Sequence, residues 1–148
     1  MANRKNVWVE AGSILIFTGG LFTLISLVTY HAADPGIFST LKGAAQNSCG
    51  RMGASVSGKI LDFFGLGGFL VPAILFFVAH LFHRKEDWAK ITAVFSGLCV
   101  ALSSLTVFLS LQWKYWAYGD GIILTGGVLG AWVADLLFQV LNFWGAAT

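Results

Sequence analysis

Three long apolar runs dominate the pattern of hydrophobic and polar positions along this chain. Charged residues are absent from residues 11–29, 65–79 and 91–113. A helix rises about 1.5 Å per residue, so about 20 apolar residues cross the hydrocarbon core of a bilayer. The pattern therefore predicts three membrane-spanning helices, at about residues 9–30, 66–83 and 91–113.

A fourth apolar stretch lies at residues 126–148 and is less uniform. Asp135, Gln139 and Asn142 form a polar stripe at helical spacing, with apolar residues on the other side. Such a stripe is typical of a helix lying in the membrane interface, and also of a crossing helix that turns its polar side to its neighbours. Both readings remain open, and the sequence predicts at least a partial last span.

A short block occurs twice. Residues 50–56 and 127–133 both read Gly-x-x-Gly-Ala-x-Val, and the same offset of 77 residues also relates Gly68 to Gly145. In the first copy, Met52, Val56 and Ile60 fall on one helical face. Repeated helix-plus-span units are a common way to build membrane domains. We therefore expect an internal repeat with two amphipathic interfacial helices, at about residues 50–64 and 127–142.

Composition places the whole chain in the membrane class. Only 11% of the 148 residues are charged and the mean hydropathy is +0.77, whereas about a quarter of residues are charged in a soluble domain. The fold class expected is an all-α integral membrane bundle, and residues 1–148 form a single membrane domain in contact with the lipid bilayer. The net charge of +2 is dispersed, which argues against direct nucleic-acid contact by this segment.

The distribution of positive charge predicts the orientation. Arg4 and Lys5 lie before the first apolar run, and Arg84, Lys85 and Lys90 crowd the loop between the second and third runs. Cytoplasmic segments of membrane proteins are enriched in lysine and arginine. The N-terminus is therefore expected in the cytoplasm, with residues 30–66 and 113–125 on the external side of the membrane.

Chemistry-bearing residues are sparse. His80 and His83 stand at i and i+3, which is compatible with metal binding, but both fall at the boundary of a span, where a histidine ring reaches water. The three clear spans carry no carboxylate, lysine or arginine at their centres, whereas ion-coupled transporters usually need such groups. We expect no catalytic, cofactor-binding or metal site.

Small residues mark two candidate helix-packing seams. Ala93, Gly97 and Ala101 recur at a spacing of four, and Gly126 and Gly130 form a second pair. This spacing lets two helices approach closely within a membrane. The partner helix of each seam, in this chain or in another, stays open.

Several motifs follow one another in a recognisable order. Asp34-Pro35 comes directly after the first predicted span. The other motif residues are Gly50 and Gly53 before the second span, Pro72 within it, and Gly127 and Asp135 in the last apolar stretch. In their order and spacing, these residues resemble the N-terminal membrane domain of the FtsK/SpoIIIE family of bacterial DNA translocases. The resemblance covers nearly the whole chain.

The resemblance implies a four-span anchor at the division septum, with both termini in the cytoplasm. In the family a linker and a hexameric ATPase motor follow, and none of that machinery is recognisable in these residues. It implies an anchor or localisation domain without catalysis of its own, in contact with other division or envelope proteins and with copies of itself. The family has a full fourth span after the position of Gly145, where only three residues remain here, so either this is a fragment or residues 121–148 are the last crossing.

Two other functions stay open on the residues alone. A small channel or transporter subunit would use Asp135, Gln139 and Asn142 to line a polar path. An assembly factor for another envelope complex would use the same external surfaces with different partners.

Overall fold

The computed structural model describes the backbone of residues 2–37, 39 and 43–145, and the side chains of residues 7–37, 39 and 43–141. The described chain is mostly helical, which confirms the expected fold class. Within it, three helical stretches are long and apolar enough to cross a membrane: Val7–Val28, Gly50–His83 and Trp88–Gln112. The helix at Gly127–Leu141 is apolar but shorter.

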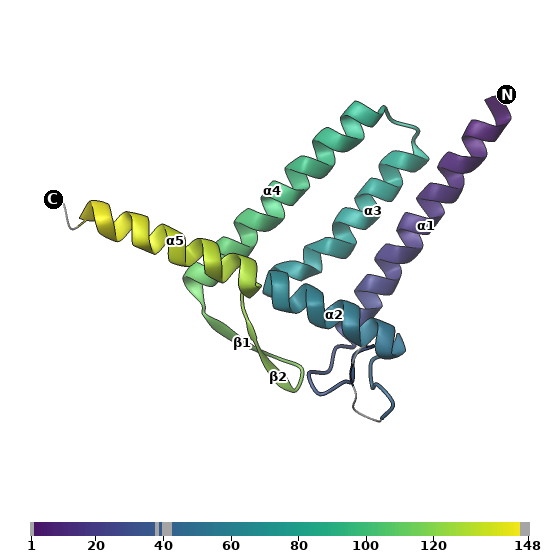
Figure 1. The fold of residues 1–148 in the computed structure, drawn as a ribbon. Helices are drawn as coiled ribbons and strands as arrows, with labels where there is room; N and C mark the ends of the chain where they lie inside the picture. Colours follow the sequence, from purple (N-terminus) through teal and green to yellow (C-terminus); the bar gives the residue numbers. More distant parts are fainter. Residues whose placement is uncertain (1, 38, 40–42, 146–148) are drawn as a thin grey trace.

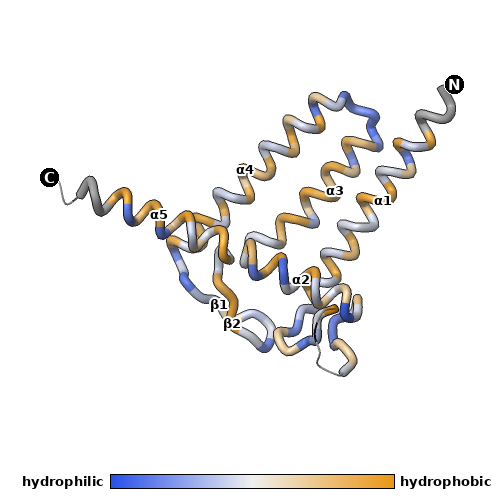
Figure 2. Tube along the Cα trace, viewed as in Figure 1, coloured by the Kyte–Doolittle hydropathy of each residue, from blue (hydrophilic) through white to orange (hydrophobic). Residues whose placement is uncertain are grey.

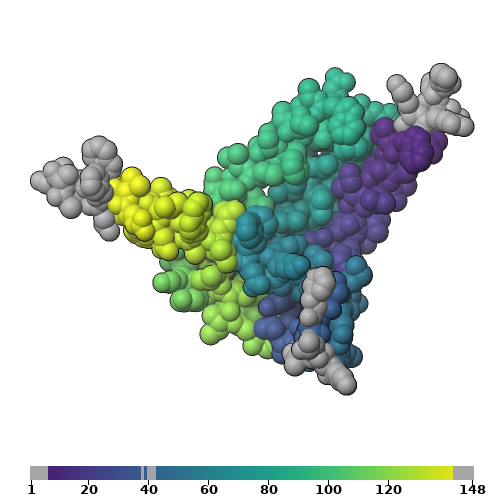
Figure 3. Space-filling model, in the orientation of Figure 1, coloured from purple at the N-terminus to yellow at the C-terminus, as the bar shows by residue number. Residues whose placement is uncertain are grey.

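Three helices run side by side and form the body of the molecule (Figure 1). They are α1 (Ala2–Val28), α3 (Leu70–His83) and α4 (Trp88–Gln112). Two further helices, α2 (Gly50–Phe64) and α5 (Gly127–Gly145), lie obliquely to them, and α5 projects from the body (Figure 3). A short 3₁₀ helix, η1 (Gly65–Phe69), joins α2 to α3, so the regular α-helix begins four residues later than the predicted span.

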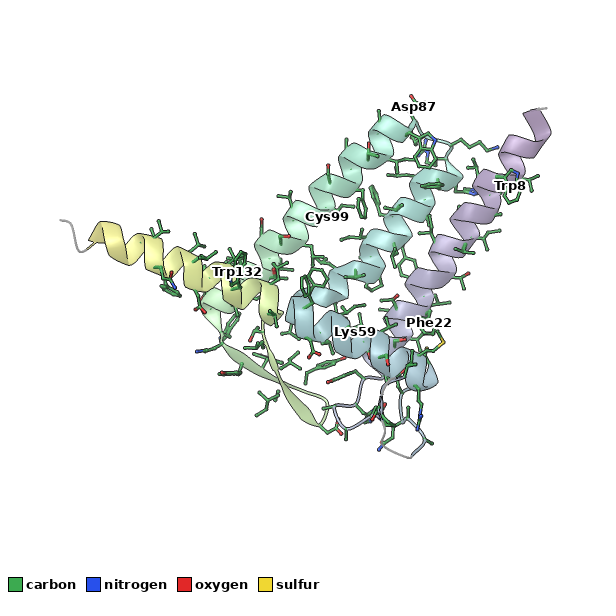
Figure 4. The ribbon with its side chains drawn as sticks, in the orientation of Figure 1. Trp8, Phe22, Lys59, Asp87, Cys99 and Trp132 are labelled. Carbon is green, nitrogen blue, oxygen red and sulfur yellow. The ribbon has the colours of Figure 1, made fainter. Side chains whose placement is uncertain are left out.

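The bundle has two different ends. The turn between α3 and α4, at residues 84–87, lies at the same end as the N-terminus and is hydrophilic (Figure 2); we call this the turn end. The opposite end holds α2, residues 29–37 and 43–49 and a β-hairpin, and we call it the hairpin end. Figure 4 shows Trp8 and Asp87 at the turn end, with Lys59 of α2 at the other.

The side chains of the spans face outward to a large extent. Ile14 and Leu15 are 66% and 76% exposed on α1, and Val100 and Phe108 are exposed on α4. Contiguous exposed apolar surface of this kind marks a membrane or protein contact, because water does not solvate it favourably. The three spans thus present their apolar side chains to lipid while their helices satisfy the backbone hydrogen bonds internally.

The tightest core lies at the hairpin end. Leu27 of α1, Leu61 of α2 and Ile123 of the hairpin are almost fully buried together. Partly buried aromatic and aliphatic side chains surround them, among them Tyr30, Phe69 and Tyr118. Three segments far apart in the sequence therefore meet in one hydrophobic cluster at the hairpin end.

The hairpin is a feature that the all-α expectation did not contain. Strands β1 (Tyr115–Tyr118) and β2 (Gly121–Leu124) pair antiparallel, with Tyr115 opposite Leu124 and Tyr118 opposite Gly121. Gly119 in the connecting turn has φ +60°, a conformation that glycine adopts without steric cost.

Candidate interaction surface at the hairpin end

The loop after α1 is ordered by one buried amide side chain. Asn47 is 3% exposed, and its Nδ2 donates to the carbonyl oxygens of Ser26 (2.8 Å) and Thr29 (3.1 Å) at the end of α1. The Asp34 carboxylate in turn accepts hydrogen bonds from the backbone N–H groups of Gln46 (2.7 Å) and Asn47 (2.8 Å). Asn47 thereby satisfies carbonyls that a helix end leaves without an intrahelical partner.

The hairpin is fastened to the end of α1 by one tyrosine. The Tyr118 hydroxyl donates to the Leu27 carbonyl oxygen at 3.0 Å, and its ring stacks on Tyr30 with centroids 6.2 Å apart. The backbone N–H of Ala32 donates to Asp120 Oδ1 at 3.3 Å in the hairpin turn. The hairpin and the loop after α1 therefore form one connected surface.

Both tyrosines of this stack keep their protons to higher pH than a free tyrosine. Burial raises the pKa of Tyr118 above its ordinary value of 10.0. The pKa of Tyr30 is also raised, first by burial and then by the negative charges of Asp62, Asp120 and Asp34. A protonated Tyr118 is the form that can donate to the Leu27 carbonyl, so the raised pKa preserves this bond.

Both copies of the repeated block begin a helix in the same way. Gly50 is the first residue of α2 with φ +63°, and Gly127 is the first residue of α5 with φ +65°. The prediction of two helices starting at these glycines is confirmed at both positions. The left-handed conformation explains why each block opens with glycine.

The second glycine of each block packs against the preceding span. A side chain on Gly53 would meet Asn47 and the Ser26 hydroxyl of α1. A side chain on Gly130 would meet the Thr106 carbonyl and the Ser110 hydroxyl of α4. Thus α1 with α2, and α4 with α5, are two copies of one arrangement in which a span is followed by an oblique helix resting on its end.

The two copies meet at a pair of glycines. The N–H of Leu66 donates to the Thr125 carbonyl at 2.8 Å, which places the end of α2 against the start of α5. A side chain on Gly65 would collide with backbone atoms of Thr125 and Gly127, and one on Gly127 would collide with the backbone of Phe63. Only glycine fits this crossing at either position.

The predicted seam of Gly126 and Gly130 lies at the contact between α4 and α5. Cβ atoms on both glycines would fall against the Thr106 carbonyl and Ser110 Oγ. The structure therefore supplies a partner helix for this pair within the chain.

The seam of Ala93, Gly97 and Ala101 has a different environment. All three residues are exposed on α4, and no described atom lies within 4 Å of a Cβ built on Gly97. The offset of 77 residues aligns Gly97 with Gly20 of α1, where a Cβ would lie 2.9 Å from the Phe76 ring of α3. The packing role of this seam, with a partner in this chain or in another, stays a prediction.

Of the other motif residues, the two prolines are buried and Asp135 is exposed. Pro35 in the loop and Pro72 in the first turn of α3 are buried. Asp135 is exposed on α5 and lines a cleft of about 160 Å³ together with Lys114 and Ser110. Gln139 is also exposed on α5, whereas Asn142 falls outside the side chains that the structure describes.

Sequence reasoning missed the residues that tie this surface together. Asn47 and Tyr118 bind backbone carbonyls that are distant in sequence, and no local spacing encodes such partners. The strands had a signal in Tyr115–Leu124, where two short runs of β-formers flank Gly-Asp-Gly. We expected residues 113–125 to form an external segment and did not predict the strands within it.

Within the described part of the chain, no group of three histidine, cysteine, aspartate or glutamate side chains is placed to hold a metal ion. What the hairpin end offers instead is a rigid, partly aromatic surface. Trp116 and Ile122 are exposed on the two strands, at 47% and 76%. Such a surface is suited to contact with another protein or with the lipid interface.

Three apolar spans, an oblique helix pair and an ordered cap define an integral membrane domain of the helical class. A family model described as the 4TM region of DNA translocase FtsK/SpoIIIE matches residues 5–148. The chain belongs to this family, as the sequence motifs indicated.

Two relatives show the same assignment. The chain is 31% identical over 147 residues to the DNA translocase FtsK of Pseudomonas syringae pv. syringae (strain B728a), and 28% identical over 147 residues to that of P. syringae pv. tomato (strain ATCC BAA-871 / DC3000). Each match covers 93% of this chain and 18% of the relative, so the chain spans about a fifth of their length. No solved structure matches it significantly.

Proposed function

We propose that this chain is the membrane anchor and localisation domain of a DNA translocase acting in cell division and chromosome segregation. The family assignment over residues 5–148 carries the proposal. In this account the domain holds the translocase in the inner membrane at the septum and performs no catalysis of its own. The DNA-translocating activity belongs to the relatives' remaining length.

The proposed orientation places the turn end in the cytoplasm and the hairpin end outside. Five basic and three acidic residues lie at the turn end by their positions in the chain, and the remainder carries four of each. The whole net positive charge is therefore at one end, and positive charge favours the cytoplasmic side. The hairpin end then becomes the surface available to other division or envelope proteins, and the bare face of α4 around Gly97 the surface available to a further helix or a second copy.

Localisation of the chain fused to a fluorescent protein tests this function. Expressed in dividing bacteria, the fusion is expected to concentrate at the septum. A matched variant, Tyr118→Ala, removes the fastening of the hairpin and should spread the fluorescence around the membrane while the protein remains inserted. Uniform membrane fluorescence of the unaltered chain would contradict a localising role and favour the channel or assembly-factor alternatives.

A further inference from the structure

A groove of about 480 Å³ runs between α1 and α3 in the half of the bundle nearest the turn end. Its α1 wall includes Ile14 and Phe17, and its α3 wall includes Phe76, His80 and His83. The rings of Phe17 and Phe76, with centroids 5.1 Å apart, line the part of the groove farthest from the turn end. The groove is thus apolar inside and carries two imidazoles toward the turn end.

The length of the groove matches the transition from headgroup to hydrocarbon. His83 is the last residue of α3, and Phe76 precedes it by seven residues, or about 10 Å along a helix. The polar layer on each side of a bilayer core is about 5–8 Å thick. With the charged turn of residues 84–87 in water, the imidazoles lie at headgroup level and the phenylalanines lie among acyl chains.

The net charge of the turn end favours an anionic ligand over a cationic one. Arg4 and Lys5 near the start of α1 supply this net charge, whereas Arg84, Lys85 and Lys90 are balanced in number by Glu10, Glu86 and Asp87. Two of these carboxylates contact the cations next to His83: Glu10 of α1 lies 3.7 Å from Lys85 Nζ, and Glu86 lies 3.9 Å from Arg84 Nε. Both contacts are long, and the short contact of Glu86 is with Lys90 Nζ at 2.9 Å, so Arg84 and Lys85 are held weakly and are able to bind another anion.

We propose that this groove binds an anionic phospholipid of the leaflet at the turn end. The lipid phosphate lies by His80 and His83, at the end of the groove next to the turn that carries Lys85, and an acyl chain lies against Ile14, Phe17 and Phe76. Basic pockets between membrane helices recognise acidic headgroups in this way, because an imidazole N–H or an ammonium group beside a phosphate forms a charge-assisted hydrogen bond. The chain would thereby prefer membrane regions rich in anionic lipid.

Native mass spectrometry of the purified full chain in detergent tests this site. The protein is titrated with phosphatidylglycerol or with phosphatidylethanolamine of the same acyl chains. We expect about fivefold tighter binding of the anionic lipid, the effect of roughly one basic group at a headgroup. Equal binding of the two lipids would overturn the proposal.

Variants locate the preference in the groove. His80→Gln with His83→Gln should abolish it, whereas the matched control His31→Gln, in the loop after α1, should retain it. His80→Gln with His83→Arg places a cation at the headgroup end of the groove and should restore the preference. Because His80 and His83 are exposed, these changes leave the fold intact, and the melting temperature verifies this. A preference that survives in the double glutamine variant, or disappears in His31→Gln, would overturn the site.

A competition arm separates the lipid from a free anion. Millimolar inorganic phosphate should leave bound phosphatidylglycerol in place, because the apolar half of the groove contributes only when an acyl chain is present. Displacement of the lipid by phosphate alone would show a simple anion site and contradict the proposal.

Discussion

Gly65 at the end of α2 and Gly127 at the start of α5 cross backbone to backbone, and each has a positive φ, of +58° and +65°. Between them the Leu66 N–H donates to the Thr125 carbonyl at 2.8 Å. The contact joins the two oblique helices, and therefore the two copies of the repeat, through their backbones at the hairpin end.

Gly127→Ala is expected to destabilise the domain by about 3 kcal/mol. The left-handed backbone penalises a Cβ, and the new methyl group would also collide with the backbone of Phe63 and Gly65. Thermal unfolding in detergent measures the loss. The matched control is Gly97→Ala, where the Cβ meets open space in a helix; it should be neutral or stabilising by up to about 1 kcal/mol. Equal effects of the two substitutions would show that the crossing carries no special constraint.

Asn47→Ala should cost about 3 kcal/mol. It removes the donor that satisfies the Ser26 and Thr29 carbonyls and leaves a small cavity in a buried place. Chemical denaturation in detergent reports the change in unfolding free energy. Gln46→Ala is the control, because its exposed side chain plays no part in these two bonds; a comparable loss there would contradict the role given to Asn47.

Tyr118→Phe is expected to lower the unfolding free energy by about 1 kcal/mol, the usual worth of one hydrogen bond. It removes the bond to the Leu27 carbonyl and retains the ring stacked on Tyr30. Tyr115→Phe, on the same strand but 60% exposed, serves as the comparison and should be neutral. If both variants unfold alike, the hairpin is not fastened through this hydroxyl.

The free energy of unfolding should fall at alkaline pH because the stacked tyrosines Tyr30 and Tyr118 lose their protons. The pKa values of Tyr30 and Tyr118 are raised in the folded state above 10.0, so folding favours their protonated forms. This contribution is complete below pH 10 and is lost as the pH rises through the raised values. Melting temperatures between pH 8 and pH 12 test it. The double variant Tyr30→Phe with Tyr118→Phe should show a shallower alkaline decline, and an identical decline would disprove the linkage.

The spans and the oblique helices could be predicted from the sequence because each is encoded locally. The apolar runs predicted the ends of α1, α3 and α4 to within four residues, except the start of α1, which begins seven residues earlier than predicted. The repeated block predicted α2 and the start of α5. A positive φ at the first residue of each helix favours glycine, and the sequence has glycine at both positions, Gly50 and Gly127. For these helices, the local sequence pattern is therefore sufficient to predict the element.

The surface at the hairpin end could not be predicted in the same way. Asn47 and Tyr118 act by binding carbonyls 18 to 91 residues away, and a backbone carbonyl has no sequence signature. Tyr115–Tyr118 lies beside a span, where aromatic residues are also expected at the membrane interface, so its strand signal was ambiguous. Gly65 gave no signal as a crossing point because its partner at Gly127 lies in the other copy of the repeat.

The orientation of the bundle is the central claim, and cysteine accessibility tests it most directly. Single cysteines replace Ile122 on the hairpin or Asp87 at the turn end, in a chain carrying Cys49→Ser and Cys99→Ser. A membrane-impermeant maleimide is then applied to intact spheroplasts and to lysed cells. We predict that Ile122→Cys is labelled in intact spheroplasts and Asp87→Cys only after lysis. Labelling of Asp87→Cys in intact spheroplasts, with Ile122→Cys protected, would invert the orientation and contradict the account of an anchor whose hairpin end faces outward.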